Sequence, residues 1–452
     1  MKIIVIGNGK IGNVITEQLS YEGHEVTVID QNESTLNTLQ NHMDILCICG
    51  NGALKEVQIE AGIRKTDLLI AATAGDELNL LCCLIAKKLG AKHTIARVRN
   101  PEYADQLGMI SEDLGLSMSI NPELAAAHEI FSVLRFPGLL SVEEFAHGKF
   151  ELAEFKLQKE SIITSMDLVS LSQKYDVKAL VCAVQRGKHT IIPNGDFILQ
   201  PEDIVSFAAS PMEAEKFLQM AGVKSRMPKD VIIVGAGRIT YYLIRMMKRM
   251  GMHPIVIERD EKKAKQIFQH FPKALVISGD GTDREILHEE GIAEVDAFVA
   301  LTGTDEVNIL LSMYAQSQEV PKVVTKVSRM TALDLIDSDD LGSVISPKDI
   351  IASRIVSYVR AMEKAGKSNV ETLYRICGGN VEALEFIALT DDRKVIGVPF
   401  KDLKLKSNLL VCCLIRKGQI VIPGGEDEIR LGDRVIVVTI NKHLKDLNDI
   451  LE

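Results

Sequence analysis

The chain has 452 residues, too many for one ordinary domain, because domains usually hold roughly 100–200 residues. It is 46% hydrophobic and 25% charged, a globular composition that excludes disordered, collagen-like and coiled-coil chains. The net charge of −10, the 5% aromatic content and the absence of tryptophan argue against nucleic-acid binding, which needs positive surface and stacking side chains.

Neither a membrane span nor a leader is expected. The longest apolar runs, such as residues 3–6 and 435–438, are far shorter than the roughly 20 residues of a spanning helix. Met1 and Lys2 lead directly into a strand pattern, without the apolar region of a signal peptide. The eight cysteines lie mostly in apolar runs and form no CxxC pair, which favours buried thiols in a cytoplasmic protein.

An internal repeat sets the predicted architecture. Corresponding positions lie 228 to 230 residues apart, namely Gly7 and Gly235, Asp30 and Glu258, Thr73 and Thr302, and the turns at 191–195 and 421–425. The chain therefore reads as two copies of a larger and a smaller unit. We name these N-lobe 1 (1–125), C-lobe 1 with a crossover helix (126–228), N-lobe 2 (229–350) and C-lobe 2 with a crossover helix (351–452).

Each N-lobe alternates strand and helix patterns. In N-lobe 1 the predicted strands are 2–6, 25–29, 44–48, 67–72 and 93–98, and the clearest amphipathic helices are 10–21 and 78–89. Apolar strands alternating with helices predict an α/β fold with a Rossmann-like parallel sheet covered on both faces. The C-lobes have short strands and Pro-Asn-Gly or Pro-Gly-Gly turns, which predict a small α+β module.

A helix is predicted after each N-lobe, at 121–135 and 346–361, with a proline near its first turn. Its apolar residues suit a buried face. That face could pack between subunits or within its own chain.

A glycine-rich fingerprint opens the first repeat directly after a strand. It reads Gly7, Asn8, Gly9, Lys10, Ile11, Gly12. The three glycines permit a tight turn, a close backbone approach to a pyrophosphate, and close packing of helix on strand. Asp30 follows Gly12 by 18 residues, near the spacing of a carboxylate that accepts from ribose hydroxyls. Its charge disfavours a 2′-phosphate, so NAD(H) or an adenine nucleotide is preferred to NADP(H).

The second fingerprint is degraded. Gly235, Gly237 and Arg238 remain, but Thr240 stands where the third glycine belongs and is expected to crowd helix against strand. Glu258 holds the acidic position. Two interpretations stay open for this repeat, a functional nucleotide site and a turn that has lost its ligand.

Further candidates follow the other strands, at the sheet edge where ligands of such folds bind. They are Gly50, Asn51, Gly279 and Asp280 after the third strands, Thr73 and Ala74 after the fourth, and Arg97 and Arg99 after the fifth. The glycines could be simple loop residues, and the acids Asp76 and Asp305 could cap helices rather than touch a ligand. The arginines could bond a pyrophosphate or stand solvated at the rim.

No catalytic constellation accompanies this site. A dehydrogenase needs an acid or base beside the reacting carbon, yet the ten histidines are scattered along the chain. Nucleophile-elbow, Walker A and HExxH motifs are also missing. We therefore expect a binding protein rather than an enzyme, with an NAD-dependent oxidoreductase as the alternative.

These motifs together resemble the tandem RCK (or KTN) proteins, the regulatory subunits of Trk-type potassium uptake systems. The resemblance extends over essentially the whole chain. It rests on the turn at 7–12, Asp30, the Gly-Asn-Gly at 50–52, the segment 73–79, the stretch 95–103 ending in Arg-Asn-Pro-Glu-Tyr, and the C-lobe pattern from 422 to 438.

The resemblance implies a regulatory role without covalent chemistry. Such proteins form homo-oligomeric rings, as dimers or tetramers, at the inner face of the cell membrane beneath a Trk/Ktr-type potassium transporter. They bind NAD(H), ATP or ADP, and here Gly7, Gly9, Gly12, Asp30 and Arg99 would touch the nucleotide, with Arg97 less firmly implied. A regulator of another potassium channel or of an efflux antiporter, built on the same modules, is the second alternative.

Overall fold

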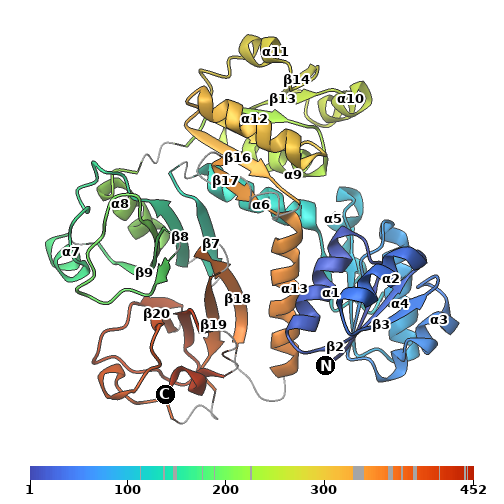
Figure 1. The fold of residues 1–452 in the computed structure, drawn as a ribbon, viewed down its shortest axis with the longest axis horizontal. Helices are drawn as coiled ribbons and strands as arrows, with labels where there is room; N and C mark the ends of the chain where they lie inside the picture. Colours follow the sequence, from blue (N-terminus) through green and yellow to red (C-terminus); the bar gives the residue numbers. More distant parts are fainter. Residues whose placement is uncertain are drawn as a thin grey trace.

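The structure is a computed structural model of the chain. It describes residues 1–111, 113–135, 138–145, 150–175, 177–187, 189–223, 227–328, 341–364, 370–377, 380–389, 394–416, 418–441, 444 and 446–452. Figure 1 shows two α/β lobes, a pair of smaller β-rich lobes, and two helices that run between them.

N-lobe 1 is a six-stranded parallel sheet in the order β3-β2-β1-β4-β5-β6. Its strands are β1 (Lys2–Ile6), β2 (Glu25–Asp30), β3 (Leu46–Cys49), β4 (Leu68–Ala71), β5 (His93–Arg97) and β6 (Met118–Ile120). Its helices are α1 (Lys10–Tyr21), α2 (Glu33–His42), α3 (Lys55–Glu60), α4 (Asp76–Leu89) and α5 (Pro101–Ile110), with a 3₁₀ turn at Ile63–Lys65. The five predicted strands and both predicted helices are confirmed. The three-residue strand β6 was not predicted.

N-lobe 2 repeats this sheet in the order β14-β13-β12-β15-β16-β17. Its strands are β12 (Asp230–Val234), β13 (His253–Glu258), β14 (Leu275–Ser278), β15 (Ala297–Ala300), β16 (Lys322–Lys326) and β17 (Ser343–Ile345). Its helices are α9 (Arg238–Met247), α10 (Glu261–His270), α11 (Arg284–Glu289) and α12 (Asp305–Ser317), with a 3₁₀ turn η2 (Lys248–Met250). In both lobes the central strands are apolar on both faces, as a sheet sandwiched between helices requires.

The C-lobes are small antiparallel sheets of five strands each, in the orders β10-β9-β11-β8-β7 and β18-β19-β22-β20-β21. C-lobe 1 holds β7 (Ser141–Phe145), β8 (Phe150–Lys156), α7 (Leu168–Lys174), β9 (Ala179–Arg186), β10 (His189–Ile191), β11 (Ile204–Ala209) and α8 (Pro211–Met220). C-lobe 2 holds β18 (Val370–Ile376), β19 (Val381–Ile387), η6 (Phe400–Asp402), β20 (Leu409–Arg416), β21 (Gln419–Val421), β22 (Arg434–Thr439) and η7 (Leu447–Ile450). The predicted tandem fold class is confirmed.

The two C-lobes pack against each other. Phe150 and Cys182 of C-lobe 1 share a buried apolar cluster with Cys412 and Ile436 of C-lobe 2. Glu154 is buried at this contact, where its Oε1 accepts hydrogen bonds from the Cys377 backbone N–H at 2.8 Å and the Ser206 hydroxyl at 2.7 Å. The C-lobe contact is thus an extension of the protein core.

The cysteine prediction holds for most of the thiols. Six of the eight are buried, and all eight are free. Burial raises the pKa of the Cys82 thiol to about 12, so this group stays protonated and unreactive. Cys49, by contrast, is exposed at the end of β3.

The two crossover helices are exchanged between the halves (Figure 1). Helix α6 (Pro122–Arg135) follows N-lobe 1 but packs on α9 of N-lobe 2, where its Ile130 and Leu134 join Leu243 in one buried cluster. Helix α13 (Pro347–Lys364) follows N-lobe 2 but packs on α1 of N-lobe 1. Of the two arrangements that the sequence left open, the apolar faces of both helices pack within the chain.

Candidate functional site

The turn between β1 and α1 has the geometry of a phosphate-binding loop. Gly7 adopts φ +97°, a left-handed conformation that glycine tolerates, and a Cβ built on it would lie 2.8 Å from the Thr73 backbone nitrogen. A Cβ on Gly12 would lie only 1.8 Å from the Gly7 carbonyl oxygen. These two glycines are therefore required by the packing of the turn on α1 and on the end of β4.

Gly9 differs from its neighbours. It is the N-cap of α1 with an extended backbone, and a Cβ built on it would meet no protein atom within 4 Å. No side chain caps α1, so the N–H groups of its first turn are available to an anion. Packing does not demand a glycine here, whereas close approach of a phosphate does. Gly237 of N-lobe 2 has the same two properties.

Asp30 ties the turn to the end of β2. Its Oδ2 accepts from the Asn8 backbone N–H at 2.6 Å and its Oδ1 from the Asn32 N–H at 2.8 Å. Glu258 does the same in N-lobe 2, accepting from Ala236 N–H at 2.7 Å and Asp260 N–H at 2.8 Å. Each carboxylate retains further lone pairs for ribose hydroxyls. The ribose contact stays a prediction, and the structure adds a supporting role for the acid.

The glycines after the third strands lie against α3 and α11. A Cβ on Gly50 would come within 3.0 Å of Val57, and one on Gly279 within 2.7 Å of Ile286. Asn51 Oδ1 accepts from Ala53 N–H at 3.0 Å. Hydrogen bonds from Thr282 lower the pKa of Asp280 below its ordinary value. These contacts support the loop interpretation for all four residues, Gly50, Asn51, Gly279 and Asp280.

The polar residues after β4 brace the edge of the sheet. Asn79 accepts through Oδ1 from the Thr73 N–H at 2.8 Å and donates through Nδ2 to the Arg97 carbonyl at 2.9 Å. Asp76 Oδ2 accepts from the Arg99 N–H at 2.9 Å. The alternative that the acid caps its helix is wrong, because Gly75 is the N-cap of α4 and no side chain caps it. In N-lobe 2, Asn308 and Asp305 repeat the bracing, and Thr304 is the N-cap.

Arg97 and Arg99 lie at the end of β5, directed back at this bracing network. Arg97 is only 8% exposed and donates to the Thr73 carbonyl, so the rim interpretation is wrong for it. Desolvation and the neighbouring charge of Arg99 lower the pKa of Arg97 to about 10, which leaves it charged at neutral pH. Arg99 donates to the Ala74 carbonyl and lies 3.6 Å from Asp76. The buried Nε atoms of both arginines have no hydrogen-bond partner among the described residues.

The second half of the chain completes the surroundings of these arginines. Tyr242 of α9 donates its hydroxyl to the Arg99 carbonyl at 3.2 Å and accepts from Asn121 Nδ2 at 2.9 Å. Arg238, the first residue of α9, lies close enough to add its charge to the fields at Arg97 and at Glu123. Burial raises the pKa of Glu123 although three arginines surround it.

The arrangement is reciprocal. Lys326 stands in N-lobe 2 where Arg97 stands in N-lobe 1, and its pKa is lowered by burial and by the charge of Lys10, the first residue of α1. The start of each phosphate-turn helix therefore lies near the basic residue that ends the fifth strand of the other lobe. Five cations and three carboxylates act on one another here, namely Lys10, Arg97, Arg99, Arg238 and Lys326 with Glu123, Asp76 and Asp305.

Sequence reasoning missed Glu123 and Tyr242 as parts of this site. The signal for Glu123 was its place in Asn-Pro-Glu, directly after the sheet, where the second repeat has Ser-Pro-Lys. Tyr242 could not be found in this way, because its partner Arg99 lies 143 residues earlier in the chain.

The turn of N-lobe 2 is intact despite Thr240. Gly235 keeps a positive φ of +109°, and the buried Thr240 donates its hydroxyl to the Gly235 carbonyl at 2.6 Å. The expected crowding is therefore replaced by a hydrogen bond. This geometry favours a functional second turn over a collapsed one.

Two absences hold for the described ranges of the chain. They contain no group of three or more His, Cys, Asp or Glu side chains that could hold a metal ion. They also contain no helix with the length and apolar character needed to cross a bilayer.

Comparison with solved structures identifies the same arrangement of lobes. The crystal structure of the GsuK RCK domain superposes with a TM-score of 0.65 at 16% identity, covering 97% of this chain and 92% of that one. The GsuK channel bound to NAD superposes with a TM-score of 0.64 at 16% identity, covering 97% of this chain and 76% of that one. At this identity the likeness concerns the fold.

Sequence comparison gives the family. The model of the TrkA-N domain matches residues 3–122 and 231–347, and that of the TrkA-C domain matches 152–222 and 384–452. The Trk system potassium uptake protein TrkA of Halomonas elongata is 31% identical over 98% of this chain and 96% of its own length. TrkA homolog 1 of Methanosarcina mazei is 30% identical over 97% of both chains. The chain therefore belongs to the TrkA family of potassium uptake proteins, with the N- and C-domain pair present twice.

Proposed function

We propose that the chain is the nucleotide-binding regulatory subunit of a Trk/Ktr-type potassium uptake system, which it controls by a change of conformation. The relatives named above are potassium uptake proteins, and their similarity extends along nearly the whole chain. The observation that carries the nucleotide role is the intact glycine turn of N-lobe 1, whose uncapped helix start lies near a cluster of cations from both halves.

The proposed ligand is NAD(H), with ATP or ADP as the other candidates. Asp30 ends β2 and favours a free 2′-hydroxyl over a 2′-phosphate because its charge repels the latter. The structural neighbour GsuK has been solved bound to NAD and, separately, bound to ADP. For contact with the nucleotide we propose the turn 7–12, Asp30, Thr73, Ala74, Arg97 and Arg99, and the corresponding turn, Arg238 and Glu258 in N-lobe 2.

The mechanism we propose is electrostatic. Without a ligand, the five cations between the lobes repel one another, and Glu123, Asp76 and Asp305 offset only part of their charge. A di- or triphosphate would neutralise them and draw the N-lobes together. Ligands with different phosphate charges would then bind most tightly at different separations of the N-lobes. A switch requires such a difference in affinity between two conformations.

We propose no catalytic activity for the chain. An oxidoreductase would need a proton donor or acceptor at the nicotinamide end, and the sequence contains no catalytic motif that would supply one. A regulator of a potassium channel or an antiporter is the second candidate, and the fold match with the GsuK channel favours a channel. Co-purification with a transporter or a channel distinguishes the two.

The proposed partners are the membrane transporter and further copies of the chain, as a dimer or tetramer that forms a ring. The protein would then lie in the cytoplasm, held at the inner face of the membrane by the transporter. We propose that the four lobes divide after residues 125, 228 and 350. The first and last of these boundaries fall inside the exchanged helices α6 and α13.

Asp30→Asn tests the ligand assignment. The amide cannot repel a 2′-phosphate, and it loses charge-assisted acceptance, worth about 1.5–3 kcal/mol. We expect NADH to bind roughly 10- to 100-fold more weakly, with NADP(H) affected far less. Calorimetry on the full chain measures both constants. Equal losses for the two dinucleotides would contradict the contact between Asp30 and the ribose.

Arg238→Met tests whether the two halves share one ligand. In a Glu258→Ala background, which weakens the second site, we expect the remaining nucleotide to bind roughly tenfold more weakly when Arg238 is replaced. Lys248→Met serves as the matched control, because Lys248 directly follows α9 at the end remote from Arg238. An unchanged affinity in the Arg238 variant would show that each lobe binds alone.

A flux assay tests the regulatory role itself. Proteoliposomes that contain the Trk-type transporter of the same cell take up labelled potassium or rubidium, and the chain is added on the cytoplasmic side. We expect uptake to depend on both the chain and the nucleotide. Uptake that is indifferent to the chain would contradict the proposed function.

A further inference from the structure

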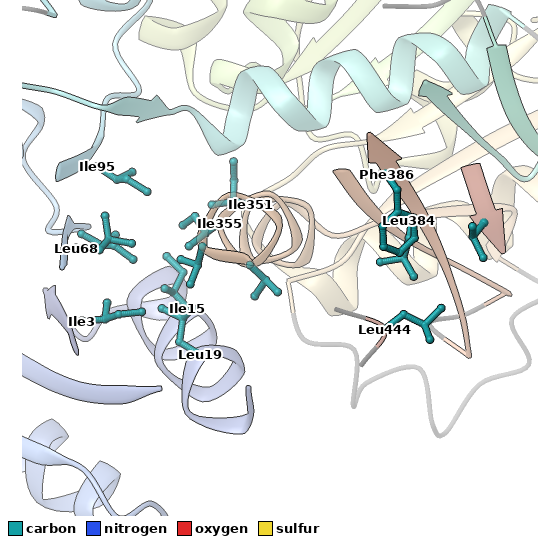
Figure 2. Close-up of a cluster of buried hydrophobic side chains, with 14 of the residues drawn as sticks. Ile3, Ile15, Leu19, Leu68, Ile95, Ile351, Ile355, Leu384, Phe386 and Leu444 are labelled. Carbon is teal, nitrogen blue, oxygen red and sulfur yellow. The ribbon is translucent and has the colours of Figure 1, made fainter. Parts of the chain in front are cut away.

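The apolar cores join the lobes in an unequal way. N-lobe 1, helix α13 and C-lobe 2 share one buried cluster, in which Ile15 and Leu19 of α1 pack against Ile351 and Ile355 of α13 (Figure 2). The same cluster continues into C-lobe 2 at Leu384 and other residues of its sheet. C-lobe 1 has a separate core around Phe155, Phe207 and Phe217. N-lobe 1 is thus packed continuously with the C-lobe of the other repeat.

A buried ion triad lies along this continuous core. Arg360 of α13 donates through Nε and Nη2 to both carboxylate oxygens of Glu22, at 2.9 and 2.7 Å. Its Nη1 lies 3.7 Å from Glu382 Oε2 on β19. The side chains of Arg360 and Glu22 are 8% exposed and that of Glu382 is 4% exposed. One guanidinium therefore links N-lobe 1 to C-lobe 2.

The position of Glu22 connects this triad with the proposed nucleotide site. Glu22 is the C-cap of α1, and Gly9 of the phosphate turn is its N-cap. The intervening helix has 12 residues, about 18 Å at 1.5 Å per residue. A displacement imposed by phosphates at the start of α1 would be carried to Glu22, because a packed helix moves as a rigid element.

The same ion pair cannot form in the second half, because methionine stands at the position of Glu22. Gly23 and Gly251 both end their helices with positive φ, so Met250 is the counterpart of Glu22. Pro122 and Pro347 both begin the crossover helices, so Arg135 is the counterpart of Arg360. A thioether cannot accept a bidentate, charge-assisted pair of hydrogen bonds. The bidentate pair that Glu22 forms with Arg360 therefore has no equivalent at Met250.

From these contacts we propose that Glu22 and Arg360 transmit nucleotide occupancy of N-lobe 1 to C-lobe 2, so that the two C-lobes report different sites. Arg360 acts as a positioning residue, since it lies at the end of α1 remote from the phosphate turn. The inference rests on the proposed nucleotide-binding function. Breaking one arm of the triad should separate binding from its effect on C-lobe 2.

Hydrogen–deuterium exchange on the full chain, with and without NADH, measures this coupling. Segments 381–387 and 409–416 report C-lobe 2, while 150–156 and 179–186 report C-lobe 1. We expect NADH to change exchange in C-lobe 2 more than in C-lobe 1. Glu22→Met, which installs the residue of the second half and leaves Arg360 beside Glu382, should reduce that change by at least about fivefold.

Controls separate coupling from stability. Glu426→Gln removes an exposed ion pair with Lys401 in the same lobe and should leave the NADH response unchanged. Glu22→Gln, which keeps the shape and one acceptor, replaces Glu22→Met should the latter fail to fold. A purely structural role would raise exchange equally with and without NADH.

The outcomes are distinct. A C-lobe 2 response that is lost in the Glu22 variant, with NADH still bound in calorimetry, supports the proposal. Equal responses of the two C-lobes in the natural protein, or an undiminished response in both Glu22 variants, overturn it and leave the proposed function standing. Failure of NADH, ATP and ADP alike to bind the natural protein would contradict the proposed function and this inference with it.

Discussion

Gly12→Val is expected to abolish nucleotide binding at N-lobe 1, with a loss of at least about 100-fold in affinity, or roughly 2.7 kcal/mol. The reason is steric. A Cβ at this position would lie 1.8 Å from the Gly7 carbonyl oxygen, so either the turn or α1 must move. The turn and the start of α1 are the groups proposed to bind phosphate, and both would be displaced. Calorimetry with NADH and a melting curve without ligand measure the two consequences.

Gly9→Ala is the matched control for this prediction. A Cβ on Gly9 meets no protein atom within 4 Å, so the melting temperature without ligand should not change. Binding should still weaken about tenfold or more, because the methyl group occupies the path of the phosphate. Should Gly12→Val bind NADH like the natural protein, the nucleotide would have to lie elsewhere.

Gly12→Thr is also informative, because N-lobe 2 contains threonine at the corresponding position. There the Thr240 hydroxyl bonds the Gly235 carbonyl at 2.6 Å and the turn survives. N-lobe 1 built with threonine should therefore fold. Its residual affinity would show how far the second turn differs from the first as a nucleotide site.

Lys322→Met is expected to change how stability depends on pH. Lys322 is buried on β16, where its Nζ donates to the Leu139 carbonyl and, at 3.0 Å, to the Ser343 hydroxyl. Burial lowers the pKa of this amine from 10.5 to about 7 in the folded protein. Between these values the unfolded chain binds more protons than the folded one, so the free energy of unfolding rises with pH from about 7 to 10.5.

The size of this effect is large for one residue. A shift from 10.5 to about 7, at 1.36 kcal/mol per pKa unit, sets an upper bound of about 5 kcal/mol on the change across that window. In Lys322→Met this contribution should vanish, and the variant should gain stability relative to the natural protein at or below pH 7. Urea unfolding at several pH values measures the slope.

The control for Lys322→Met is Lys401→Met, since Lys401 is half exposed and forms a surface ion pair with Glu426. Its pH slope should follow that of the natural protein. A slope in Lys322→Met that matches the natural protein would mean that the amine stays charged throughout, held by the Leu139 carbonyl and the Ser343 hydroxyl.

Much of the fold could be predicted because the N-lobes obey local rules. Residues 2–6 are a strand and residues 10–21 a helix in both prediction and structure. The short apolar run is typical of a buried strand, and the amphipathic spacing is typical of a helix. The repeat then extended this result to the second half. Strand β6 was missed because three residues leave too little pattern to detect.

The exchange of α6 and α13 could not be predicted. The apolar residues of α6, among them Ile130 and Leu134, indicate that the helix has a buried face. They do not indicate which element packs against that face. That face packs on α9, more than 100 residues later in the chain. For the same reason the sequence gave no sign that Arg238 lies near Arg97.

Side-chain roles within loops were the other source of error. Asp76 has the residue type and position of a helix cap, yet its carboxylate accepts from the backbone of the next strand's loop instead. Both uses satisfy the same acceptor atoms, so residue type alone could not separate them. Thr240 was expected to crowd its helix against the strand. The sequence does not show that its hydroxyl donates a hydrogen bond to the Gly235 carbonyl.

We propose above all that the N-lobes bind an adenine nucleotide without turning it over. Calorimetry of the purified full chain against NAD⁺, NADH, ATP, ADP and NADP⁺, with a melting curve at about 100 times each dissociation constant, tests it most directly. We predict saturable binding of NAD(H) or an adenine nucleotide, weaker binding of NADP⁺, stabilisation of about 2.7 kcal/mol, and recovery of the ligand unchanged. Absence of binding by all five, or conversion of a bound dinucleotide, would contradict the account.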